Sequence, residues 1–284
     1  MKIFKLENVS LDMLKTLFEI MSKVNKTDDT INFMLSNSSM SAINSNQAES
    51  VFKRWVIKHN KIASGVSGEL MGEIKVSIFN GKDFSKKILG FFGQMANIEF
   101  YHDGKDVMKI VLKKLDKDGK VMLNISCACA DTSISFNEYP QDSIEILFGL
   151  GSDYSPKTSF MLIKEDILNI IKLSALNSNS EEQKKYVKIY SENGSIKATD
   201  NAFDVVLGDD VFGLNTEIEI DKSILPLIDG GDYKVELTEH DDLKFIILTL
   251  NSDKVDNKIT INLLSDISTD VQWDEFQDFG NSFE

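Results

Sequence analysis

The sequence contains few of the residues from which catalytic and metal sites are usually built. Its 284 residues include only two cysteines and three histidines. Cys127 and Cys129 lie two apart in an alternating segment, and without nearby histidines they cannot form a structural zinc site. His59, His102 and His240 are far apart in sequence, so we expect solvated loop residues and not ligands. The sequence therefore predicts no enzymatic activity, no metal and no other cofactor.

Long apolar runs are also missing. No stretch approaches about 18 consecutive apolar residues, the length that a membrane-spanning helix needs. Residues 1–6 have the pattern of a strand and not the apolar centre of a signal peptide. We therefore expect no membrane contact and a cytoplasmic location, which would be the host cytoplasm or a viral replication compartment for a viral protein.

Positive charge is in the minority, with 31 Lys and Arg against 45 Asp and Glu, for a net charge of −14. Taken as an average, this argues against nucleic-acid binding, because phosphate contacts need clustered basic residues. The charges are unevenly placed, however. Residues 268–284 contain five acids and no base, whereas several lysines lie in the helix candidates. The sequence is therefore still compatible with a basic stripe on an otherwise acidic protein.

A strand, one amphipathic helix and further strands recur four times, over residues 1–62, 70–137, 157–207 and 213–264. The helix candidates are residues 10–25, 82–95, 164–177 and 221–229. Apolar residues recur at helical spacing in the first candidate at Leu11, Leu14, Leu17, Phe18 and Met21, and in the second at Phe84, Ile88, Phe91, Phe92 and Met95. Pro226 fits poorly in the fourth. Few helices among many strands predict an α+β protein with antiparallel sheets.

Residues 138–158 differ from the rest, because two turn-like segments flank the short apolar run 144–148. We predict that this segment connects two similar domains, residues 1–137 and residues 159–267, each with two helices packed on antiparallel sheets. Residues 268–284 would follow as an acidic tail.

The tail contains aromatic residues at regular intervals. Trp273, Phe276, Phe279 and Phe283 are spaced three, three and four apart, which would form one stripe on a helix. Such a segment is typical of a peptide that binds a partner. It could equally be a disordered tail or a strap onto its own body.

Residues 2–267 resemble the DNA sliding clamps, in particular the two-domain type of eukaryotes, archaea and phages. Residues 11–26, followed by 31–43 and the polar segment 44–47, are similar to the opening helix, strand pair and turn of that family. Residues 224–228 followed by 231–237 look like the last helix and strand of phage clamps. The resemblance implies a viral processivity factor in which three copies close into a ring, with helices lining the hole.

Such a ring would encircle duplex DNA and tether DNA polymerase, a clamp loader, and other replication or transcription proteins. The resemblance implies that seven lysines face the phosphates: Lys15, Lys82, Lys86, Lys87, Lys164, Lys172 and Lys222. Sparse lysines would give a non-specific, salt-sensitive grip that permits sliding. They could also simply occupy the solvated faces of amphipathic helices.

The resemblance also implies an apolar partner pocket beside the connector. Its wall would be formed by Ile43, Leu147, Phe148, Leu150, Ile261, Leu263 and Leu264. Leu147 and Phe148 could instead be core residues that hold the connector in place. The seam between copies would pair two edge strands, for which we predict residues 107–115 and 195–199.

Two other functions remain open. One is a single-stranded DNA-binding replication protein whose acidic tail recruits partners. The body argues against it, because no strand interleaves basic residues with several aromatics, and residues 52–55 are the nearest approach. The other is a monomeric, clamp-like processivity factor that holds DNA on one basic face without closing a ring.

Overall fold

The computed structural model describes residues 1–22, 30–46, 48–175, 186–200, 203–209, 217–228, 230–240 and 243–263. These residues form three antiparallel sheets. The first has the order β5 (Gly65–Ser67), β1 (Lys2–Ser10), β7 (Met95–His102), β8 (Val107–Leu115) and β9 (Val121–Ala128). The third has the order β13 (Asp204–Asp209), β12 (Ser195–Thr199), β11 (Tyr186–Glu192) and β14 (Ile218–Asp221).

The second sheet has eight strands and joins the two halves of the chain. Its order is β10 (Thr158–Leu162), β15 (Tyr233–His240), β16 (Leu243–Leu250), β17 (Val255–Leu263), β4 (Val51–Lys58), β3 (Ser39–Ser45), β2 (Ile31–Leu35) and β6 (Ile74–Ile78). The junction is the antiparallel pair β17–β4, in which Ile261 lies opposite Val51 and Val255 opposite Ile57. The last strand among the described residues is therefore hydrogen-bonded to one of the first.

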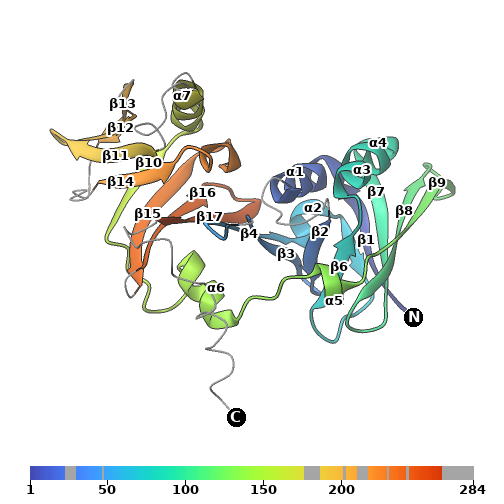
Figure 1. Cartoon of the computed structure of the whole chain (residues 1–284). Coiled ribbons are helices and arrows are strands. Elements are labelled where there is room, and N and C mark those ends of the chain that lie inside the picture. The colour runs from blue at the N-terminus through green and yellow to red at the C-terminus, as the bar shows by residue number, and fades with distance from the viewer. Residues whose placement is uncertain are drawn as a thin grey trace, which may run out of the picture.

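The helices lie on two sides of these sheets (Figure 1). On one side are α1 (Leu11–Ser22), α3 (Gly81–Asp83), the π-helical turn η1 (Phe84–Ile88), α4 (Leu89–Phe92) and α7 (Lys164–Ala175). On the other side are α5 (Thr132–Ser135) and α6 (Gln141–Phe148). The remaining short elements are α2 (His59–Ile62) and the 3₁₀ turn η2 (Leu225–Leu227).

Two buried apolar clusters hold these layers together. In the first, Leu14 and Phe18 of α1 and Phe92 of α4 pack against residues of the five-stranded sheet and of β2, β3, β4 and β6. In the second, Ile167 and Ile170 of α7 pack against β10, β11 and β14–β17. The predicted α+β class with antiparallel sheets is confirmed.

The buried face of the second predicted helix differs from the one that the sequence predicts. Because η1 is a π-turn, the buried apolar residues after Phe84 are Leu89 and Phe92, five and then three positions on. Phe91 is 70% exposed, and Met95 belongs to β7. The extra residue in the π-turn shifts the register by one position, which an even 3.6-residue period cannot anticipate.

The prediction of the two seam strands was wrong. The bounds of β8 and β12 agree with the predicted strands, but β8 lies between β7 and β9, and β12 lies between β11 and β13. Their main-chain groups are therefore already paired on both sides. The outer strands of these two sheets are β5 and β9 in one, and β13 and β14 in the other.

Three other local predictions also need correction. His59 and His102 are buried and not solvated, because α2 packs on the first sheet and β7 is central in it. The helix expected at residues 221–229 is reduced to the single turn η2, with Pro226 inside it. Within the connector, the predicted apolar run 144–148 belongs to the helix α6, which ends where Gly149 adopts a left-handed conformation with φ of 57°.

Candidate nucleic-acid and partner interfaces

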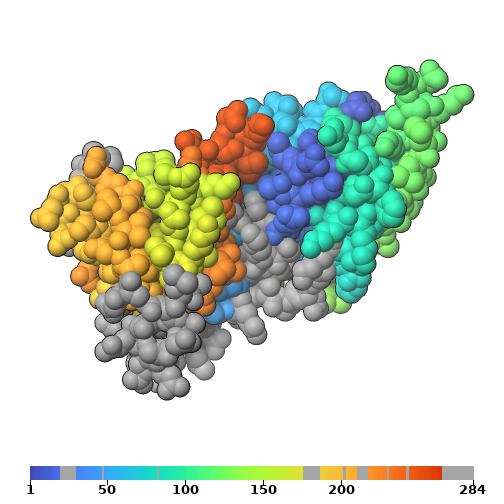
Figure 2. Space-filling view, turned by 90° about the horizontal axis from the view of Figure 1, so that it is seen from above, coloured from blue at the N-terminus to red at the C-terminus, as the bar shows by residue number. Residues whose placement is uncertain are grey.

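The face that carries α1, the α3–η1–α4 segment and α7 is seen from above in Figure 2. We call it the helical face. Lys86 and Lys87 are exposed on the π-turn, and Lys164 and Lys172 are exposed on α7. Lys15 on α1 is partly buried and lies 3.4 Å from Asp12. The fold therefore brings together, on one side, lysines that are widely separated in sequence.

Acidic residues accompany these lysines. Asp12 is paired with Lys15, and Asp83 lies 2.9 Å from the ammonium of Lys87. In the part of the chain that the structure describes, Lys86, Lys164 and Lys172 form no ion pair. Those three side chains are therefore the cations most available to an external phosphate.

Lys222 has a structural role. Its side chain is only 15% exposed and lies 2.5 Å from the carboxylate of Asp200, which is fully buried. A buried carboxylate without a counter-ion costs several kcal/mol, of the order of 3–5 when the partner is removed. The prediction that Lys222 contacts DNA was therefore wrong, because this ammonium neutralises an internal charge. The side chain of Lys82 lies outside the described residues.

The opposite side of the molecule has a cavity of about 560 Å³, which we call the connector groove. It lies between the connector and the outward side of β2, β3, β4 and β6. Its apolar lining is formed by Met34, Ala42, Ile43, Val56, Phe136, Tyr139, Ile144 and Leu150. Its charged lining is formed by Arg54, Glu73, Lys75 and Glu138.

Strand alternation produces this groove. In β3, Met40 is buried in the first cluster, whereas Ser39, Ser41 and Ile43 point to the other side. In β4, Arg54 and Val56 point to that side too. These outward side chains form the floor of the groove, and the connector forms the wall.

Polar and aromatic contacts hold the connector beside this floor. The ring of Tyr139 lies 6.1 Å from that of Phe52 in an edge-on arrangement, and its hydroxyl lies 3.0 Å from Ser45 Oγ. Lys75 forms an ion pair with Glu138, and its ammonium lies 5.6 Å from the centre of the Phe136 ring. Specific contacts therefore attach the connector, which forms the wall of the groove, to the strands that form its floor.

The predicted partner residues divide into three groups. Ile43 and Leu150 line the groove. Leu147 and Phe148 attach α6 to β17, because Thr260 Oγ1 donates to the Leu147 carbonyl at 2.5 Å and Lys258 Nζ donates to the Phe148 carbonyl at 2.9 Å. Phe148 is fully buried, so it holds the connector in place.

Ile261 and Leu263 form the third group, and the prediction for them was wrong. Thr260 faces the connector, so its neighbours on β17 face the opposite side. Both residues are part of the second buried cluster under α7. Leu264 lies outside the described residues.

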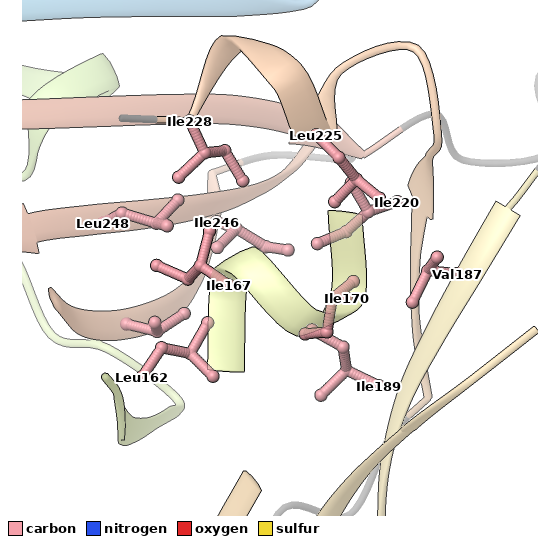
Figure 3. A pocket seen from close by; sticks show the side chains of 11 residues that line it. Leu162, Ile167, Ile170, Val187, Ile189, Ile220, Leu225, Ile228, Ile246 and Leu248 are labelled. Carbon is pink, nitrogen blue, oxygen red and sulfur yellow. The ribbon is translucent and has the colours of Figure 1, made fainter. Parts of the chain in front are cut away.

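A second, much smaller cavity of about 20 Å³ lies inside the second cluster (Figure 3). Aliphatic side chains alone line it, and Ile167 and Ile170 of α7 face Val187, Ile246 and Leu248 across it. A void of this size has room for about one water molecule and offers no polar partner. It is a packing defect of the core and not a ligand site.

The described residues contain no group of three His, Cys, Asp or Glu side chains that could hold a metal. Burial raises the pKa of the Cys127 thiol and raises that of Cys129 to about 12. Both thiols are therefore protonated near neutral pH and are poor nucleophiles. Within the described parts of the chain, no helix is long and apolar enough to cross a membrane.

Comparisons with solved structures address the fold. Proliferating cellular nuclear antigen (PCNA) from Entamoeba histolytica matches with a TM-score of 0.63 and 13% identity, over 93% of this chain and 100% of that chain. PCNA from A. fulgidus, solved with the C-terminal region of FEN-1 bound, matches with a TM-score of 0.60 and 9% identity, over 93% and 99%. This chain has the DNA sliding-clamp fold.

The likeness extends to bacterial clamps of greater length. DNA polymerase III subunit beta from Borrelia burgdorferi matches with a TM-score of 0.61 and 12% identity, over 95% of this chain. This chain spans only 66% of that subunit. No protein-family model matches the sequence, and no curated protein matches it either. The sliding-clamp fold is thus visible in the tertiary structure, with little sequence identity.

The fold also identifies groove residues that the sequence prediction had not named. Met34, Val56, Phe136, Tyr139 and Ile144 line the groove together with Ile43. Alternation in residues 39–45 and 51–58 could have separated inward from outward side chains. It could not have shown that residues 136–150 pass over the outward side.

Proposed function

We propose that the protein is a sliding clamp that encircles duplex DNA and tethers replication proteins to it. The observation that carries the proposal is the separation of two faces, with the helical face on one side of the sheets and the connector groove on the other. In this proposal residues 1–137 and 159–267 are the two clamp domains, and residues 138–158 connect them. The protein itself performs no chemistry.

Ring closure would need two complementary edges. We propose that β9 of one copy pairs with β13 of the next, because among the described residues both are outer strands of their sheets. Val121 and Met122 on β9 and Val206 on β13 are all more than half exposed, and a seam would cover them. The pairing is head-to-tail, and the sequence resemblance implies that three copies close it.

DNA would pass through the ring along the helical face. Lys86, Lys164 and Lys172 would contact phosphates as mobile point charges, and Lys15 and Lys87 would contribute when their acids release them. Few cations interleaved with acids make a weak and non-specific contact. Retention on DNA would then depend on the closed ring more than on affinity.

Partner proteins would use the connector groove. The A. fulgidus neighbour was solved with a segment of FEN-1 bound, which supports a peptide as the type of ligand. A cavity of about 560 Å³ lies in the usual range of about 300–1,000 Å³ for ligand sites. We propose DNA polymerase and a clamp loader as the partners of this surface.

The test is retention on circular DNA. Protein loaded on a nicked plasmid should stay on the plasmid through gel filtration, and it should be lost after a single restriction cut. Light scattering should give a mass near three times the 32.0 kDa of one chain. Equal loss from circular and linear DNA would contradict encirclement, and a strict monomer would favour the open-faced processivity factor.

A further inference from the structure

We infer that residues 268–284 of this chain bind its own connector groove as a weak internal ligand, which a partner peptide must displace. The inference rests on the proposed function of the groove as a peptide site. The tail lies outside the described residues, and the inference rests on its sequence, its point of attachment and the groove.

The attachment point lies near the groove. The described chain ends at Leu263 in β17, and Thr260 on the same strand lies opposite Phe52 in β4. The ring of Phe52 contacts that of Tyr139, which lines the groove. The end of β17 is therefore separated from the groove wall by only one neighbouring strand, β4, and the contact between Phe52 and Tyr139.

The tail has sufficient length to reach it. Trp273 follows Leu263 by ten residues. Ten residues of chain can span at most about 35 Å. The aromatic residues of the tail can therefore reach the groove of the same chain without any rearrangement of the sheets.

The chemistry of the two surfaces is complementary in its apolar part. The groove presents Met34, Ile43, Val56 and Ile144 together with the rings of Phe136 and Tyr139. The tail presents Trp273, Phe276 and Phe279 at three-residue intervals. Aromatic side chains bury large areas at low entropic cost, which makes them the usual anchors of short peptides in such grooves.

The charges keep this contact weak. The cations of the groove already have partners, since Arg54 pairs with Asp256 at 2.8 Å and Lys75 pairs with Glu138. The acids of the tail therefore gain little from them, and Glu73 in the lining repels those acids. The groove attracts the aromatic rings of the tail and repels its carboxylates, so a partner peptide without that repulsion can displace the tail.

Tethering compensates for the weakness. A short flexible tether gives an effective concentration of the order of millimolar. With about 4 mM at the groove and a segment dissociation constant of about 1 mM, the tail would lower the apparent affinity of a competing peptide by about fivefold. The tail would thus exclude weak ligands and admit strong ones.

The test is methyl NMR on the full-length protein. In the W273A/F276A/F279A variant, the methyl signals of Met34, Ile43 and Ile144 should shift, whereas those of Met95 and Met108, which are not in the groove lining, should not. A synthetic peptide of residues 268–284 added to that variant should restore the wild-type positions. Groove signals that are identical in wild type and variant would overturn the inference.

A pair of body variants provides the matched control. Ile144→Glu replaces an apolar group of the groove lining by an anion that repels the acidic peptide, and it should abolish the response to the peptide. Ile134→Glu, at a residue of α5 that is 86% exposed and outside the lining, should leave the response intact. An equal response in both variants would contradict binding at the groove. Retention on circular DNA should be unchanged in the tail variant, so a failed tail contact with intact retention refutes this inference alone.

Discussion

The ammonium of Lys258 donates a hydrogen bond to the main-chain carbonyl of Phe148, 2.9 Å away. Lys258 belongs to β17 and Phe148 to the last turn of α6, so this bond joins the connector to the central sheet. A cation at the end of a helix also interacts favourably with its exposed carbonyls. Burial lowers the pKa of Lys258, and the nearby carboxylates of Asp256 and Glu236 oppose that effect.

This contact leads to a prediction on stability. Lys258→Met keeps the apolar stem but leaves the Phe148 carbonyl without its donor, so we expect a loss of about 1–2 kcal/mol in the free energy of unfolding. Urea denaturation measures it. Lys254→Met, at an exposed residue in the turn before β17, is the control and should change stability by less than about 0.5 kcal/mol. Equal stability of the two variants would show that the bond contributes nothing.

A second prediction concerns acid. His102 is 2% exposed, and neither ring nitrogen has a hydrogen-bond partner among the described residues. Burial lowers its pKa below the ordinary 6.5, the charges of Lys2 and the N-terminus lower it further, and Asp103 opposes them. Burial likewise lowers the pKa of His59.

The sign follows from proton uptake. Below about pH 6.5 the unfolded chain binds a proton at each of these histidines that the folded chain does not, so stability falls as pH decreases. The contribution of one histidine cannot exceed about 1.4 kcal/mol per pH unit. His102→Phe should flatten the dependence between pH 7 and 5, measured by urea midpoints. An unchanged slope in His102→Phe would refute this origin.

A third prediction tests the π-turn. Leu89→Ala removes a fully buried side chain and should cost about 2–5 kcal/mol. Phe91→Ala removes a larger side chain that is 70% exposed and should change the unfolding free energy of the monomer by about 0.5 kcal/mol or less. A regular α-helix through residues 81–92 would reverse this order. Thermal denaturation of the two variants at one concentration therefore distinguishes the two registers.

A fourth prediction uses the small cavity under α7. Val187→Ile adds one methyl group towards a void of about 20 Å³, and we expect a gain of about 0.5–1 kcal/mol. Val76→Ile makes the same change at a fully buried position outside that cavity and should destabilise by about 1–3 kcal/mol. Loss of stability in Val187→Ile would show that the cavity cannot accept the group.

The fifth prediction concerns DNA. Charge reversal of Lys86, Lys164 and Lys172 together should weaken retention on duplex DNA and reduce the slope of log affinity against log salt by about 3. Lys105→Glu is the control, because Lys105 is an exposed residue away from the helical face. It lies in the β7–β8 turn, where its carbonyl accepts a hydrogen bond from the main-chain N–H of Lys75, a residue of the connector groove. Folding should be unaffected in both. An unchanged salt slope in the triple variant would refute the assignment of the helical face.

The amino-acid sequence by itself determined the local elements. Leu11, Leu14 and Phe18 at helical spacing specify α1, and the alternating residues 107–115 specify β8 with the bounds that the structure has. Such elements depend on which side chains share a face, and that is a property of neighbours in the chain. The resemblance of the whole arrangement to sliding clamps was also present at this level.

The tertiary structure decided the roles of individual residues. Whether β8 or β9 forms the outer edge depends on pairing between distant segments, and alternation does not encode it. Lys222 and Lys86 look alike on a helix candidate, but only the folded chain places Lys222 beside buried Asp200. Ile261 and Thr260 are adjacent, yet only the position of α6 shows which of them faces the connector. The periodicity of the sequence determines which side chains share a face of a helix or strand. Packing between distant segments determines which neighbours, or solvent, each face contacts.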